Sequence, residues 1–198
     1  MAPVWNTHSH VDHETALAHI QELSTLTPPV GFQTAYIPST VSPGSVTDSN
    51  RDLDLDTPDE LAVRSLILGI VHRTLGDHQG SRMLLHDAMK HWKGAETNSW
   101  VGGVTYFELA VLDMKEGERA AAEAGEDVNG VVGEDSEKST VFDTWRRTIQ
   151  SAREALHTAH ALCTREADLS SRLDSRIVML REEIEVKMRM EGVSVGDM

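Results

Sequence analysis

The chain has 198 residues, of which 39% are hydrophobic and 25% are charged, so it can build one ordinary domain with a sizeable core. Its formal net charge is −14, which argues against a nucleic-acid backbone or an anionic membrane as the main partner, because both are negative themselves. The single cysteine, Cys163, excludes an internal disulfide, and the longest apolar stretch, Leu66–Val71, is too short to cross a bilayer. Because Met1–Val11 lacks the pattern of a signal peptide, we expect a soluble, cytoplasmic protein.

Residues 1–57 are predicted to form a mostly extended, flexible N-terminal segment. A short helix is expected at Glu14–Ser24, where apolar residues fall on one side. The stretch that follows, TPPVGFQTAYIPSTVSPGSVTDSN, is rich in Pro, Gly, Ser and Thr and keeps no period of 2 or 3.6. Such a composition is typical of a linker, here pinned locally by Phe32 and Tyr36.

Two longer helices are predicted next. Thr57-Pro58-Asp59-Glu60 has the order of a capping box with proline at the first helical position, so a helix begins there. Its apolar run ends at Gly76-Asp77. A second helix is expected from His78 to Trp92, and Lys93-Gly94 gives it a basic last turn and a glycine stop.

The rest of the chain predicts three more helices, over residues 98–116, 141–164 and 168–190. The stretch 117–139 is acidic, rich in Gly, Ala and Glu, and without a pattern, so it is predicted to be a solvated loop. Residues 191–198 are a tail. Since no segment alternates like a half-buried strand, the sequence predicts an all-α protein with about five helices in antiparallel hairpins.

A repeat signature lies in the first hairpin, LGIVHRTLGDHQGSRMLLHDA. Leu68-Gly69 is followed seven residues later by Leu75-Gly76, and Ser81, Leu85 and Ala88 then alternate small and bulky positions. This order resembles the tetratricopeptide repeat. Small side chains at Gly69 and Ser81 would let the two helices approach closely, so the resemblance has a steric reason. The sequence departs from the repeat at His72, where the repeat has an aromatic residue, and no proline closes the unit.

Three stretches in order, DELAVRSLILGIVHRTLGD, VTYFELAVLDMKEG and LSSRLDSRIVMLREEI, resemble the tetratricopeptide-repeat 39 family, which includes the fungal inclusion body clearance proteins. They cover residues 58–190 and correspond to the C-terminal part of usually much longer proteins. The resemblance implies a tetratricopeptide-like helical domain without enzymatic activity or cofactors. In fungi it implies clearance of protein inclusions together with lipid-droplet proteins and sterol derivatives, in the cytoplasm and also in the nucleus.

Two other functions are consistent with the residues. The stretch THSHVDH, residues 7–13, resembles the zinc motif of metallo-β-lactamase-like hydrolases, which makes a zinc-dependent hydrolase the first alternative. In those enzymes the motif follows several strands, whereas here six residues precede it and helices follow, so a solvated tail is favoured. Metal binding by His8, His10 and His13 stays open. The second alternative is a non-functional or assembly-dependent fragment, because about two repeats fall short of the roughly three that an array needs.

The remaining chemistry-bearing side chains have structural interpretations. The histidines expected at the surface or in a groove include His72, His78, His86 and His91. Cys163 is expected to be a small packed thiol, and two of Trp92, Trp100 and Trp145 are expected in the core. No residue is therefore assigned a catalytic, cofactor-binding or metal-binding role. The sequence predicts a scaffold that binds other proteins, with an acidic surface that favours basic partner segments.

Overall fold

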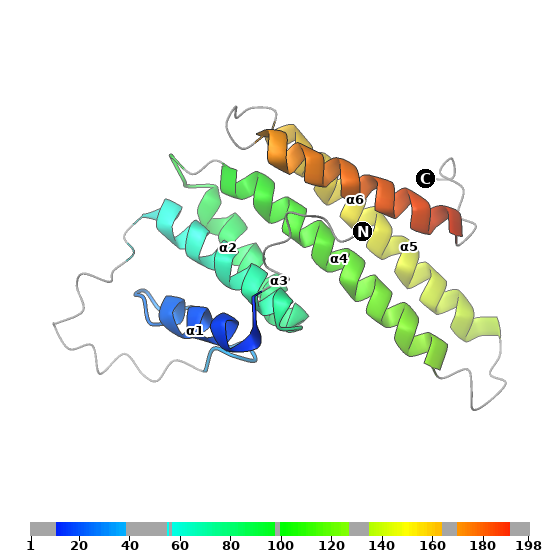
Figure 1. Ribbon diagram of the computed structural model, residues 1–198, viewed down its shortest axis with the longest axis horizontal. Helices are drawn as coiled ribbons and strands as arrows, with labels where there is room; N and C mark the ends of the chain where they lie inside the picture. Colours follow the sequence, from blue (N-terminus) through cyan, green and yellow to red (C-terminus); the bar gives the residue numbers. More distant parts are fainter. Residues whose placement is uncertain are drawn as a thin grey trace. The chain divides into compact units, whose positions relative to one another are not determined.

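The computed structural model describes residues 11–38, 55, 57–97, 100–126, 135–163 and 170–190 (Figure 1). The regular elements in these ranges are six helices, packed as antiparallel pairs, which confirms the all-α class. They are α1 (His13–Ser24), α2 (Pro58–Thr74), α3 (His78–Trp92), α4 (Trp100–Glu126), α5 (Asp135–Cys163) and α6 (Ser170–Met190). Of these, α1 is the short helix expected at Glu14–Ser24. Within the described ranges, no helix combines the length and the apolar character that a membrane crossing requires.

Two compact units divide the chain, one within Met1–Val101 and the other within Gly102–Met198. The boundary falls in the first turn of α4, so α1, α2 and α3 belong to the first unit. Each unit buries an apolar core of its own.

In the first unit, α2 and α3 form an antiparallel hairpin whose ends follow the sequence signals. The Thr57 hydroxyl accepts a hydrogen bond from the Glu60 amide, and the Glu60 carboxylate accepts one from the Thr57 amide, which completes the capping box. Gly76 has φ +81°, a left-handed conformation that glycine adopts without strain, and it turns the chain between the two helices. Asp77 then caps α3 through the Gly80 amide.

Residues 11–38, which we call the covering segment, pack against this hairpin. The segment contains α1 and the stretch 25–38, and it buries four apolar side chains against α2 and α3: Ala16, Ile20, Val30 and Ile37. Phe32 and Tyr36 pack beside them, as expected. In 25–38, Val30 and Ile37 are buried by the hydrophobic effect although the stretch has the composition of a linker. Residues 1–10 and 39–54 lie outside the described residues.

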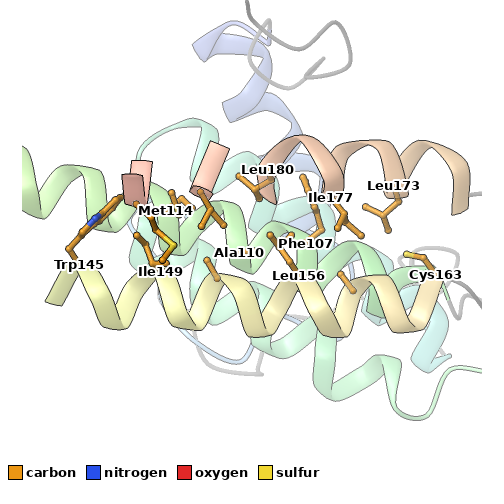
Figure 2. Close-up of a cluster of buried hydrophobic side chains, with 14 residues drawn as sticks. Phe107, Ala110, Met114, Trp145, Ile149, Leu156, Cys163, Leu173, Ile177 and Leu180 are labelled. Carbon is orange, nitrogen blue, oxygen red and sulfur yellow. The ribbon is translucent and has the colours of Figure 1, made fainter. Parts of the chain in front are cut away.

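In the second unit, α4, α5 and α6 share one core (Figure 2). Along α4, Gly103 lies against Cys163 and Gly117 lies against Trp145, so α5 runs antiparallel to α4. Apolar side chains spaced three or four residues apart along α6 are buried in this core: Leu173, Ile177, Leu180, Ile184 and Met188. Cys163 is a buried thiol, as expected.

The predicted acidic loop at 117–139 is wrong at both ends, because α4 continues through Glu126 and α5 begins at Asp135. Alanine and glutamate are strong helix formers, so this stretch propagates a helix although it lacks an apolar period. At its start, Gly117 is buried, and a Cβ there would lie 2.6 Å from the Trp145 ring. The glycine that was expected to end a helix is instead a contact point between two helices.

Candidate functional site

Of the histidine-rich stretch at residues 7–13, the structure describes only residues 11–13. Asp12 caps α1, since its carboxylate accepts hydrogen bonds from the Thr15 amide (2.9 Å) and the Thr15 hydroxyl (2.8 Å). These bonds lower the pKa of Asp12. His13 is the first residue of α1 and is exposed, while His8 and His10 lie outside the described residues. Among the residues with a defined position, no group of three or more His, Cys, Asp or Glu could hold a metal ion.

The α2–α3 hairpin has the close contact that the repeat signature predicts. A Cβ at Gly69 would lie 2.9 Å from both Cγ and Cδ2 of Leu85, which leaves room for no side chain. The Ser81 hydroxyl donates a buried hydrogen bond of 2.7 Å to the Gly69 carbonyl oxygen. Leu68 and Ala88 are fully buried, as a packed hairpin requires. Glycine and serine at the crossing therefore set the helix separation.

One side of this hairpin carries the covering segment. We call the apolar residues on that side, Leu68, Val71, Leu75 and Leu84, the hairpin face. Ala16 and Ile20 of α1 are four residues apart and so project from the same side of a helix toward this face. Val30 and Ile37 contact it from the extended stretch. The hairpin face thus binds an amphipathic helix followed by an extended strand of chain.

Arg64 holds the first half of the extended stretch. Its guanidinium Nη1 donates to the carbonyl oxygens of Leu26 (3.1 Å) and Pro28 (2.6 Å). Burial lowers the pKa of Arg64, and the nearby Asp87 carboxylate opposes that effect. The Leu55 amide adds a hydrogen bond of 2.7 Å to the Thr27 carbonyl. A charged donor that satisfies two backbone acceptors makes a strong contact. The strength of this contact does not depend on pH near neutrality.

His72 and Asp77 hold the second half. The imidazole Nδ1 lies 2.8 Å from Asp77 Oδ2, and the same oxygen accepts a hydrogen bond from the Ala35 amide (3.2 Å). Tyr36 packs its ring edge against the imidazole, with centroids 5.5 Å apart, and its hydroxyl donates to the Leu75 carbonyl (3.3 Å). One carboxylate therefore joins the end of α2, the start of α3 and the covering segment.

The expectation that His72 lies at the surface or in a groove is wrong, because its side chain is fully buried. Desolvation lowers the pKa of His72, although the Asp77 carboxylate works in the opposite direction. For Asp77, burial would raise the pKa, but hydrogen bonds from Gly80, His72 and Ala35 outweigh it and lower the pKa. The pair is therefore a neutral imidazole that donates to an ionised carboxylate.

Sequence reasoning missed Arg64, His72 and Asp77 as residues of this site. Asp77 had a visible signal, since an aspartate directly before a helix is a preferred cap. Arg64 and His72 had none, because each sits in an apolar helix. The partners of Arg64, Leu26 and Pro28, and the ring that packs on His72, Tyr36, come from a segment far away in the chain. No family model, no curated protein and no solved structure matches this chain.

Proposed function

We propose that this chain is a non-enzymatic, tetratricopeptide-like scaffold that binds segments of other proteins on its α2–α3 hairpin. The fold assignment is supported by the order of small and bulky residues in the hairpin and by the contact of Gly69 with Leu85. In such repeats each hairpin buries its apolar side against a neighbouring segment, which leaves surfaces suited to peptides and helices.

The observation that carries the proposal is the covering segment on the hairpin face. It shows which shape and chemistry the face accepts: an amphipathic helix, with apolar residues four apart, and an extended stretch with apolar side chains. Protein partners that dock a helix into an apolar groove use the same pattern of anchors. The net charge of −14 favours basic flanks on such a partner and speeds the encounter.

For the cellular process, we propose the clearance of protein inclusions together with lipid-droplet proteins, in the cytoplasm and the nucleus. This part rests on the three ordered stretches that resemble the tetratricopeptide-repeat 39 family. The first of these stretches covers most of α2 and the turn that follows it, and it contains Leu68, Val71 and Leu75 of the hairpin face.

Photo-crosslinking in cells tests the function. A photoreactive residue replaces Ile67, which is 40% exposed on α2 one turn before Val71, in the full chain. The matched control replaces Val178, which is 49% exposed on α6 in the other unit. In cells with heat-induced inclusions, we expect inclusion or lipid-droplet proteins to be cross-linked from position 67 and not from position 178.

Equal cross-linking from both positions, or none from a folded chain, would contradict the proposal. Metal analysis of the purified chain addresses the hydrolase alternative separately. Stoichiometric zinc that is lost when His8 and His10 are both replaced by alanine would overturn the non-enzymatic function in favour of a zinc hydrolase.

A further inference from the structure

The covering segment is attached to the hairpin by two contacts of different chemistry. At residues 26–28 the contact is a guanidinium, Arg64, on backbone carbonyls. At residues 34–37 it is the Asp77 carboxylate, which is itself held by the buried imidazole of His72. Guanidinium groups keep their proton at every pH that a cell reaches, whereas an imidazole changes charge near neutrality. The two halves of the segment must therefore respond differently to acid.

From this geometry we propose that residues 34–37 form an acid-released latch, which opens from the hairpin when His72 is protonated while residues 26–28 stay attached through Arg64. This inference rests on the proposed function, because it assigns a regulation to the hairpin face. Opening would separate Tyr36 and Ile37 from α2 and expose the hairpin face next to them, where a partner segment could then bind.

The first argument is that the closed latch has no acceptor for a second imidazole proton. His72 Nδ1 is already paired with Asp77, and Nε2 is buried with no hydrogen-bond partner among the described residues. Protonation would make Nε2 a charged donor without an acceptor, in a side chain with 0% exposure. A buried unpaired charge is strongly unfavourable, so the protonated imidazole needs contact with water.

The second argument is that the covering segment is what shields this imidazole on one side. The Tyr36 ring packs edge-on against it, and the Ala35 amide is bonded to the carboxylate that His72 holds. Apart from Asp77, no carboxylate among the described residues is recorded in contact with the ring. The titratable and charged groups of the elements packed around His72 are Asp12, His13, Glu14, His19, Glu22 and Tyr36 in the covering segment, Asp59, Glu60, Arg64 and Arg73 in α2, and Asp77, His78, Arg82, His86, Asp87, Lys90 and His91 in α3 and its cap.

The direction of the pH dependence follows from proton counting. In the closed form the pKa of His72 lies below its ordinary value of 6.5, so below pH 6.5 the open form binds more protons than the closed form. The equilibrium constant for opening therefore rises as the pH falls from 6.5, by at most about tenfold per pH unit. Well above 6.5 both forms hold a neutral imidazole, so the dependence fades as the pH rises. Asp77 does not interfere, because its pKa is lowered from 3.8 and it stays ionised through this window.

Amide hydrogen exchange of the full chain tests the latch, followed by NMR between about pH 5 and pH 7.5 and corrected for the intrinsic exchange rate. The reporters are the amides of Ala35 and Ile37, which donate to Asp77 and to the Thr34 hydroxyl. The internal control is the Leu55 amide, which donates to Thr27 in the half held by Arg64. Below pH 6.5 we expect protection of Ala35 and Ile37 to fall by up to about tenfold per unit while that of Leu55 stays constant.

Two variants distinguish the contribution of the His72 imidazole from that of the other contacts of the latch. His72→Gln keeps a donor for Asp77 and removes the titration, so protection of Ala35 should become independent of pH. Tyr36→Phe removes only the hydroxyl bond to Leu75, so protection should fall at every pH with an unchanged slope. If His72→Gln fails to fold, the ring resonances of His72 in the natural chain decide, because their titration must coincide with the loss of protection.

The latch is overturned if protection of Ala35 and Ile37 does not change with pH, if it falls equally in His72→Gln, or if Leu55 loses protection in parallel. None of these measurements needs a partner, so a negative result removes the latch and leaves the binding function standing. Conversely, if the chain opens in acid but no inclusion or lipid-droplet protein is cross-linked from position 67, the latch is supported and the proposed function is contradicted.

Discussion

Replacing Gly69 with alanine probes the helix crossing on which the hairpin face depends. The new Cβ would lie 2.9 Å from two carbons of Leu85, whereas the optimum for such contacts is about 3.5–4.0 Å. Either the helices separate or Leu85 leaves its rotamer, and overpacking of this kind costs about 1–3 kcal/mol. Alanine also forms helix better than glycine by about 1 kcal/mol, so the net loss of unfolding free energy should be about 0–2 kcal/mol.

That range alone would not be decisive, so the test is a double-mutant cycle with Leu85→Ala. The second substitution removes both close carbons, and the next nearest atom is the residue-85 backbone nitrogen, 3.3 Å from the new Cβ. By itself it should cost about 2–5 kcal/mol as a cavity-forming change. In its presence, Gly69→Ala should change sign and stabilise the hairpin by up to about 1 kcal/mol, since only the gain in helix propensity remains.

The assay is urea unfolding by circular dichroism, together with hydrogen exchange of α2 amides, which reports on the first unit separately. A coupling free energy of about 1–3 kcal/mol between the two positions is expected from direct contact. Gly94→Ala is the control, because its Cβ would meet nothing nearer than 3.6 Å. Additivity of Gly69→Ala and Leu85→Ala within about 0.5 kcal/mol would refute the steric reasoning.

Three further substitutions test other contacts by the same unfolding assay. Ser81→Ala removes the buried hydroxyl that donates to Gly69 and should cost about 1 kcal/mol; a wild-type midpoint would mean that this bond contributes nothing. Arg176→Met removes the cation that lies 3.0 Å from the fully buried Glu108 and should lower the unfolding free energy of the second unit by about 3 kcal/mol. Adding Glu108→Gln should restore part of this loss. Equal stability of the single and double variants would argue against a stabilising ion pair. Thr57→Ala breaks the capping box of α2 and should cost about 1 kcal/mol, while Thr57→Ser should restore most of it.

Local signals in the sequence located the elements whose ends depend on neighbouring residues. The capping box at Thr57 and the turn at Gly76-Asp77 placed both ends of α2 and the start of α3, because these contacts close within a few residues. The crossing of Gly69 and Ser81 was also predictable, since a small residue in a helix of large apolar ones indicates a close neighbour.

Features that depend on distant segments were not predictable in this way. Gly117 looks like a helix stop until Trp145, in another helix, is placed against it. Val30 and Ile37 sit in a stretch with the composition of a linker, and only the hairpin makes them core residues. His72 was expected at the surface or in a groove, and its burial could not be read from its own helix because its neighbour Tyr36 comes from a distant segment.

The covered hairpin face also bears on whether this chain needs a larger repeat array. A helix hairpin cannot bury its apolar face alone, and in an array the next repeat covers it. An assembly-dependent fragment therefore predicts an open apolar face on α2 and α3. Here α1 and residues 25–38 cover the hairpin face from within the same chain.

Covering from within the chain has a thermodynamic consequence for any partner of the hairpin face. A partner that reaches the part of the hairpin face next to Tyr36 and Ile37 must displace residues 34–37, so its apparent Kd equals the intrinsic Kd divided by the fraction of chains in which these residues are open. The affinity measured at pH 7 is then weaker than the face itself allows. If His72 controls the opening, the same apparent Kd should tighten by at most about tenfold per pH unit below 6.5, until the open form predominates. Affinity and amide protection would then change over the same pH range, since both report one equilibrium.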